Sequence, residues 1–358
     1  MKPSQNPAPP VIITPSPHVH CGSTVSKAMR DVLLALLPAV LASLWFFRLQ
    51  GLTVIIACCL SAVFFEAVCQ KVMNRPVTIK DGSALLTGLL LALCLPPALS
   101  PLLAAFGGFC AIVIGKQVFG GLGNNIFNPA HIGRAILLAS MPQQMTTWTP
   151  PAASFGSVGS AAYAQAVSSA TWAAKGADAV SSATPLALLR TSEALWQKGG
   201  AAVDALPPLQ QMFFGNIPGS LGETSVPAIL LGGLFLIWRG HVDWRIPVYY
   251  LLTVFVITGA YGFFHGYPAS FPFYHLFGGG LMIGAFFMAT DWVTSPLTKR
   301  GRIIFALGLG LLTALIRLRG GFVEGVCYSI LLMNMLTPLI DRYVHIVPFG
   351  GRRRKDEK

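Results

Sequence analysis

Charged residues are scarce in this chain of 358 residues, at 11% of the total. Soluble domains carry about 25%. Acidic residues are rarest, at 13, against 25 lysines and arginines and a hydrophobic share of 54%. Because the hydrophobic residues also form long runs, the composition predicts a polytopic membrane protein and excludes an ordinary soluble enzyme.

The sequence also lacks the short motifs of metal and nucleotide chemistry. No C-x-x-C, H-E-x-x-H, Walker A or G-x-S-x-G pattern is present. Most of the seven cysteines lie in apolar runs, where a cysteine behaves as a small buried hydrophobe. No signal peptide opens the chain, and the proline-rich residues 3–17 predict a disordered tail. We therefore expect no zinc or iron–sulfur site.

The formal net charge of +12 reflects membrane orientation and not nucleic-acid binding. The basic residues lie at the ends of apolar runs, as the positive-inside rule requires. With ten spans and both termini in the cytoplasm, most lysines and arginines fall on the cytoplasmic side, with Arg317 and Arg319 as exceptions. This orientation places the long polar loop outside the membrane, in the periplasm of a Gram-negative cell.

Apolar runs predict about ten transmembrane helices. They cover residues 31–47, 52–73, 85–94, 102–119, 129–141, 226–238, 246–264, 273–290, 303–316 and 322–340. We divide the chain into a proline-rich cytoplasmic tail (1–30), a first membrane repeat (31–141), an extracytoplasmic loop (142–225), a second membrane repeat (226–341) and a basic cytoplasmic tail (342–358).

The two membrane halves resemble each other. LLTG at 85–88 and LMIG at 281–284 are 196 residues apart, as are MP at 141–142 and TP at 337–338. Each half contains five predicted spans, and repeats with an odd number of spans must lie inverted in the membrane. The predicted fold is therefore all-α, with two inverted five-helix repeats whose broken helices face each other near the midplane.

Thr184 lies in the polar loop at the expected start of a helix. Pro185 follows it, residues 186–198 have a helical pattern, and two glycines end that pattern. Thr is a good N-cap and Pro is favoured at the first helical position. A helix N-terminus favours an anion, such as a phosphate attached to the Thr184 hydroxyl. From these residues alone, the simpler interpretation is that Thr184 is only a cap.

Polar residues within or beside the apolar runs are candidates for function, because such residues are costly in a membrane. Glu66 lies deep in the second run, and Lys116, Asn128, Arg134 and Asp291 lie near short or broken runs. They are candidates for an ion path. Lys116 and Asp291 also fit positions at the cytoplasmic boundary of the membrane.

Several motifs resemble those of the D subunits of Rnf ion-translocating electron transport complexes. They are DGSALLTG at 81–88 with PP at 96–97, GKQVFGGLGNNIFNPA at 115–130, SATPL at 182–186, and GAFF at 284–287 with TD at 290–291. The match runs in order from about residue 31 to residue 341. This family is also similar to the B subunit of the sodium-pumping NADH:quinone reductase. That subunit is the alternative, and the short N-terminal tail favours the Rnf type.

The resemblance implies a membrane subunit that helps to couple electron transfer between ferredoxin and NAD to the translocation of sodium or protons. It implies FMN, a carrier of one or two electrons, joined through its phosphate to Thr184. Asp178 and Ser181 fit the pattern read by the flavin transferase, although Ser182 stands where glycine is frequent. The resemblance further implies a non-covalent riboflavin without assigned residues, and partner subunits of the A, B, C, E and G types.

Two tryptophans, Trp172 and Trp196, flank the Thr184 motif and can pack on the flavin ring. They fit interfacial anchors or loop core equally well. A passive channel or transporter is the alternative from a different functional class, because inverted five-span repeats also build such proteins. The Thr184 motif separates the two classes, since a channel needs no flavin attachment site.

Overall fold

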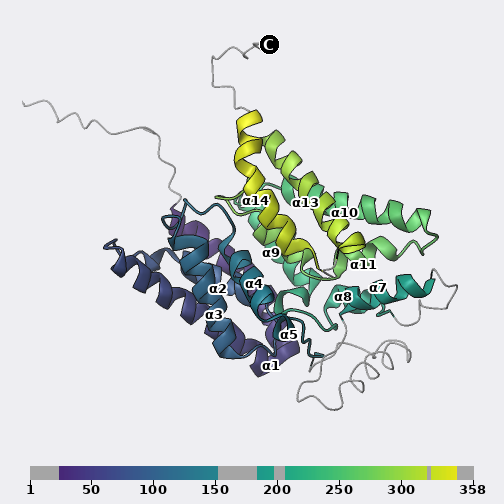
Figure 1. Ribbon diagram of the computed structural model, residues 1–358, viewed down its shortest axis with the longest axis horizontal. Helices are drawn as coiled ribbons and strands as arrows, with labels where there is room; N and C mark the ends of the chain where they lie inside the picture. The colour runs from purple at the N-terminus through teal and green to yellow at the C-terminus, as the bar shows by residue number, and fades with distance from the viewer. Residues whose placement is uncertain (1–23, 152–183, 197–205, 321–323, 345–358) are drawn as a thin grey trace, which may run out of the picture.

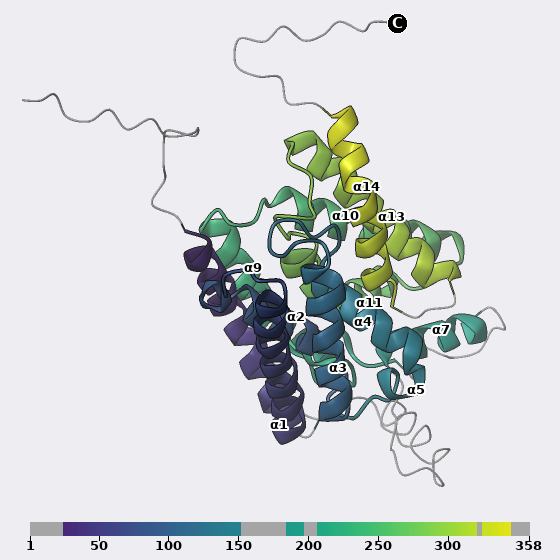
Figure 2. The same cartoon turned by 60° about the vertical axis from the view of Figure 1, so that its left-hand side comes forward.

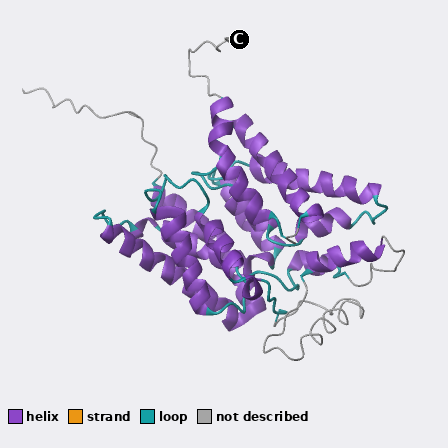
Figure 3. Ribbon diagram, in the orientation of Figure 1, coloured by secondary structure: helices purple, strands orange, loops and turns teal. Residues whose placement is uncertain are grey.

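The computed structural model describes residues 24–151, 184–196, 206–320 and 324–344, without the side chains of residues 191–196. Within these ranges every regular element is a helix (Figure 3). Figure 1 shows an N-terminal group of helices in purple and blue beside a C-terminal group in green and yellow. Figure 2 shows α4 between the two groups. The groups meet where α1 packs on α9 and α4 packs on α14.

The N-terminal group is built around one long helix. Its elements are α1 (Val25–Val72), η1 (Ile79–Asp81), α2 (Ser83–Leu93), α3 (Pro101–Ile112), the π-helix η2 (Val113–Gln117), α4 (Pro129–Ser140) and α5 (Pro142–Met145). The backbone leaves the helical conformation at Arg48, where φ is 48°. This break divides α1 into two segments that correspond to the first two predicted spans, and both α2 and α3 pack on α1.

The remaining elements form the middle of the chain and the C-terminal group. They are α7 (Pro185–Trp196), α8 (Leu209–Phe214), η4 (Leu221–Glu223), α9 (Val226–Trp238), α10 (Arg245–Phe264), α11 (Phe271–Phe277), α12 (Leu281–Ile283), the π-helix η5 (Gly284–Met288), α13 (Lys299–Arg319) and α14 (Val326–Tyr343). Local sequence explains several helix starts. The side chains of Ser100, Asn128 and Ser225 each accept a backbone N–H of the first turn, and a proline lies at the first or second helical position.

The outer faces of the helices are apolar. Large side chains such as Leu41, Leu60, Leu252 and Leu311 are more than half exposed, although they lie in the middle of long helices. Three described helices, α1, α10 and α13, are long and apolar enough to cross a bilayer, and the bent pair of α11 with α12–η5 makes a fourth. This combination identifies a multi-pass membrane protein, because lipid replaces water at these surfaces.

A sharp break separates α11 from α12, which are bent by 63° relative to each other. Gly279 lies in this break with φ +67°, a conformation that L side chains rarely adopt. A Cβ atom at Gly279 would also lie 2.8 Å from a methyl group of Leu186 and 3.0 Å from a guanidinium nitrogen of Arg317. Only glycine fits this point, where three parts of the chain meet.

The two predicted broken helices meet inside the protein. A Cβ atom at Gly222 would lie 2.8 Å from both the Leu93 carbonyl oxygen and the Ile283 side chain, and the sulfur atoms of Cys94 and Met288 are 3.6 Å apart. The ends of α2 and of α12–η5 therefore lie on either side of η4. The full set of ten spans in inverted repeats stays a prediction, since α2 and α9 have only 11 and 13 residues.

Candidate functional site

Thr184 caps the N-terminus of α7, as its sequence predicts. Its hydroxyl accepts the backbone N–H of Ala187 at 3.3 Å, its carbonyl accepts that of Leu188 at 3.0 Å, and Pro185 is the first residue of the helix. The threonine is only 7% exposed. Residues Trp172, Asp178 and Ser181 lie outside the described residues, and so does the side chain of Trp196, with which α7 ends.

Helix α7 is held to the rest of the protein by apolar packing. Leu186 and Leu189 are buried in a cluster with Met212 of α8 and with Phe271 and Tyr274 of α11. The residue that begins the helix is therefore fixed relative to the membrane helices. A group attached at Thr184 would lie next to the break between α11 and α12, which Leu186 contacts.

Glu66 and Lys116 form a buried ion pair. The ammonium group donates to both Glu66 carboxylate oxygens, at 2.8 and 2.7 Å, and to the Ser83 hydroxyl at 2.7 Å. Both residues are 1% exposed. Gln70 donates to Glu66 at 3.2 Å, and Ser83 donates to Asp81 at 2.8 Å. Lys116 therefore satisfies all three N–H groups, and it is not the boundary residue that its sequence position allows.

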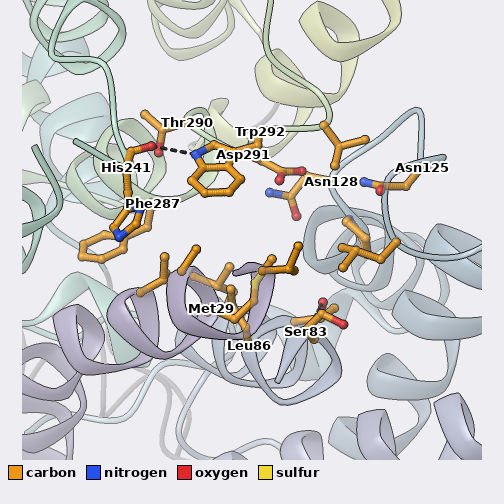
Figure 4. A pocket seen from close by; sticks show the side chains of 18 of the residues that line it. Met29, Ser83, Leu86, Asn125, Asn128, His241, Phe287, Thr290, Asp291 and Trp292 are labelled. Carbon is orange, nitrogen blue, oxygen red and sulfur yellow. Dashed lines mark hydrogen bonds between the residues drawn. The ribbon is translucent and has the colours of Figure 1, made fainter. Parts of the chain in front are cut away.

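A cavity of about 360 Å³ lies above this ion pair (Figure 4). Three of the predicted polar candidates line it, namely Lys116, Asn128 and Asp291, together with the aromatic rings of Phe287 and Trp292. Figure 4 shows Trp292 and Asp291 on one side of the cavity and residues of α1 and α2 on the other. The fourth candidate, Glu66, does not line the cavity but binds the lysine that does.

The polar residues at the cavity are held in place by hydrogen bonds. Asn128 donates to the Met288 carbonyl oxygen at 3.2 Å and caps α4 through the Ala130 N–H at 3.0 Å. Thr294 donates to the Asp291 carboxylate at 3.2 Å. Burial raises the pKa of Asp291 above its ordinary value, even though these hydrogen bonds favour the ionised form. The indole N–H of Trp292 donates to the His241 carbonyl at 2.6 Å.

Ion pairs join the helix ends beside the cavity. Asp31 of α1 accepts from Arg239 and contacts a His241 ring nitrogen, both at 2.8 Å. Asp243 pairs with Arg245 and Arg302 at 3.1 and 2.7 Å. Burial raises the pKa of Asp243, but the arginine hydrogen bonds outweigh this effect and hold the pKa below its ordinary value of 3.8. The cationic residues at this end of the protein thus fasten α1, α10 and α13 together.

A second buried charge cluster was missed by sequence reasoning. Arg134 pairs with Glu324, and Glu223 and Arg317 lie next to them. Arg317, an exception to the positive-inside rule, is 5% exposed and donates to the Gly278 carbonyl at 3.1 Å. It is thus an internal cation. The glutamates escaped notice because each lies just outside an apolar run.

The fold and these sites define a class: a multi-pass helical membrane protein with charged side chains buried between its helices. The chain belongs to the NQR2, RnfD, RnfE family, whose family model matches residues 12–350.

Three relatives, each the D subunit of an ion-translocating complex, match nearly the whole chain. The chain is 50% identical to that of the proton-translocating ferredoxin:NAD(+) oxidoreductase complex of Clostridium ljungdahlii, over 95% of this chain and 96% of the relative. It is 40% identical to that of the Na(+)-translocating ferredoxin:NAD(+) oxidoreductase complex of Acetobacterium woodii, over 96% and 97%. It is 41% identical to that of the ion-translocating oxidoreductase complex of Stutzerimonas stutzeri, over 93% and 94%. The family suggested by the sequence motifs is therefore confirmed.

Proposed function

We propose that the chain is the D-type subunit of an ion-translocating ferredoxin:NAD oxidoreductase complex in a bacterial cell membrane. The similarity along nearly the full length to three subunits of this type carries the proposal. The apolar helices and the buried ion pairs are consistent with it. In this role the chain has no complete active site, and it works with subunits of the A, B, C, E and G types.

The experiment compares membrane vesicles from cells with and without this chain. Vesicles from the deletion strain should lose NAD reduction by reduced ferredoxin, and re-expression of the chain should restore it. One relative is named as proton-translocating and another as sodium-translocating. Dependence on sodium and sensitivity to a protonophore therefore identify the ion. Unchanged NAD reduction in the deletion strain would disprove the proposal, and ion conduction by the purified chain alone would favour a channel.

The proposal includes FMN joined through its phosphate to Thr184. A hydroxyl at a helix N-terminus suits a phosphoester, because the first-turn N–H groups and the dipole stabilise the remaining negative charge. The dipole contributes only about 0.3–1 kcal/mol, which is too little to hold a cofactor without a covalent bond. When bound, FMN supplies one-electron and two-electron transfer. The chain's contribution is to fix the attachment point through the packing of α7.

Burial of Thr184 sets an order of events for attachment. A hydroxyl that is 7% exposed is not accessible to an enzyme. The flavin transferase, reading the motif that contains Asp178 and Ser181, would therefore act before α7 docks against α8 and α11. In the proposed topology both termini are cytoplasmic, ten spans form inverted repeats, and the 142–225 loop is periplasmic. The transferase would then act outside the membrane.

We also propose the cavity beside Lys116 as the site of the second, non-covalent flavin. Its lining combines the aromatic rings of Phe287 and Trp292 with the polar groups of Asn125 and Asn128, which suits a flat ring with polar edges. Trp292→Ala should lower the riboflavin released on denaturation while it leaves protein-bound flavin unchanged. Equal riboflavin content in the variant and the wild type would exclude this cavity.

A further inference from the structure

Four charged side chains from separate elements meet beside the break between α11 and α12. Arg134 of α4, Arg317 of α13 and Glu223 of η4 are 6%, 5% and 4% exposed, and Glu324 lies just before α14. Arg134 pairs with Glu324. With two arginines and two glutamates, the cluster is neutral only if both carboxyl groups are ionised.

Glu223 lacks the partner that a buried carboxylate needs. Within the described part of the chain, no lysine or arginine lies within ion-pair distance of it, and its Oε1 atom has no hydrogen-bond partner. Its closest polar neighbours are the carboxyl group of Glu324 and the side chain of Ser220. Oε1 is aimed at Gly280, where an added Cβ would lie 3.7 Å from it. An ionised carboxylate in this position would be costly.

A proton resolves this conflict. Two carboxyl groups in contact in a poorly hydrated site do not both ionise readily, because like charges repel strongly there. Glu324 is the ionised member, since Arg134 pairs with it directly. The proton therefore resides on Glu223, which can donate to Glu324 and thus satisfy an otherwise unpaired group.

We propose that Glu223 and Glu324 form a proton-binding site, in which one exchangeable proton is held between the two carboxyl groups beside Arg134 and Arg317. Contact with Glu324 favours the bound proton, and the positive charge of the arginines favours its release. Burial, followed by the Glu324 carboxylate, raises the pKa of Glu223 above its ordinary value. Proton binding changes the net charge of the cluster from zero to +1.

The other titratable groups around the site stay neutral. The rings of His131 and His275 are buried beside Arg134 and Arg317, whose positive charges disfavour a second cation. The remaining neighbours are buried thiols, namely those of Cys94 and Cys327. Glu223 is thus the group that changes charge.

The site lies next to α7, because Leu186 and the cluster contact the same glycine, Gly279. A positive charge gained there would favour negative charge on a group attached at Thr184. This consequence rests on the proposed function, whereas the proton-binding site itself does not.

Infrared spectroscopy of the purified complex tests the site. A protonated carboxyl group has a C=O stretching band that is separate from the carboxylate bands and shifts in D₂O. Subtraction of the Glu223→Gln spectrum from the wild-type spectrum should reveal one such band at neutral pH, and the band should vanish as the pH is raised. Glu324→Gln should also remove it, because Arg134 then holds Glu223 ionised. Asp243→Asn should not, since Asp243 is ionised in its arginine pairs.

Stability provides a second measurement. Gln replaces a neutral acid at position 223 but an ion-paired carboxylate at position 324. Glu223→Gln should therefore keep the thermal stability of the wild type, and Glu324→Gln should lower it. A wild-type spectrum without the band, or a band that persists in Glu223→Gln, would overturn the proposal. The band should survive in Thr184→Ala, so a failure of the flavin assignment would leave this inference intact.

Discussion

Replacement of Lys116 by Met isolates the contribution of the buried ion pair. Met has a similar volume but no charge, so Lys116→Met leaves the Glu66 carboxylate 1% exposed with only the Gln70 amide, at 3.2 Å, as a donor. Removal of one partner of a buried pair costs about 3–5 kcal/mol, because the remaining charge has no compensation. The lost hydrogen bond to Ser83 at 2.7 Å adds to this cost.

Equilibrium unfolding of the detergent-solubilised protein by SDS measures this loss. Lys116→Met should lower the free energy of unfolding by several kcal/mol, whereas a double variant that also carries Glu66→Met should recover most of it, since both charges are gone. Arg302→Met is the matched control, because its pair with Asp243 is partly exposed and contributes at most about 1 kcal/mol. A loss below about 1 kcal/mol for Lys116→Met, or a double variant as unstable as the sum of the single ones, would refute the reasoning.

Three further predictions concern the break, the loop and the charged edge. Gly279→Ala should destabilise the protein more than Gly240→Ala, because both glycines have positive φ but only Gly279 would place a Cβ against Leu186; unfolding in SDS compares them, and equal losses would exclude the contact. Cysteine at Ser157, a position outside the described residues, should react with an impermeant thiol reagent in intact cells; labelling only after lysis would contradict the topology. Asp243 has a depressed pKa, so its contribution to stability should be present above pH 3.8 and fade as the pH falls below it, and Asp243→Asn should remove that part of the acid sensitivity in a pH series of unfolding measurements.

Local patterns predicted helix starts and the nature of the surface. Thr184 with Pro185, and Asn128 with its following proline, begin helices because the cap and the missing proline N–H act within one turn. The apolar runs predicted membrane helices for the same reason, since lipid exposure is a property of each helix. The family could also be predicted, because its motifs are contiguous in the sequence.

Contacts between distant residues could not be predicted. Glu66 and Lys116 are 50 positions apart, and Arg134 and Glu324 are 190 apart, so only the fold brings each pair together. The boundary interpretation of Lys116 was wrong because the sequence does not reveal that a carboxylate faces it. Arg317 likewise violates a rule for exposed loops, because it is buried and bound to backbone carbonyls.

Flavin fluorescence of the denatured chain tests the central claim most directly. Wild-type protein made together with the flavin transferase should fluoresce in a denaturing gel, because a phosphoester to Thr184 survives unfolding. Thr184→Ala should be dark at the same level in the membrane, and Thr191→Ala, which removes another hydroxyl of α7, should fluoresce like the wild type. Fluorescence that persists in Thr184→Ala, or a wild-type chain that stays dark in the presence of the transferase, would contradict the account of this protein as a flavin-bearing subunit.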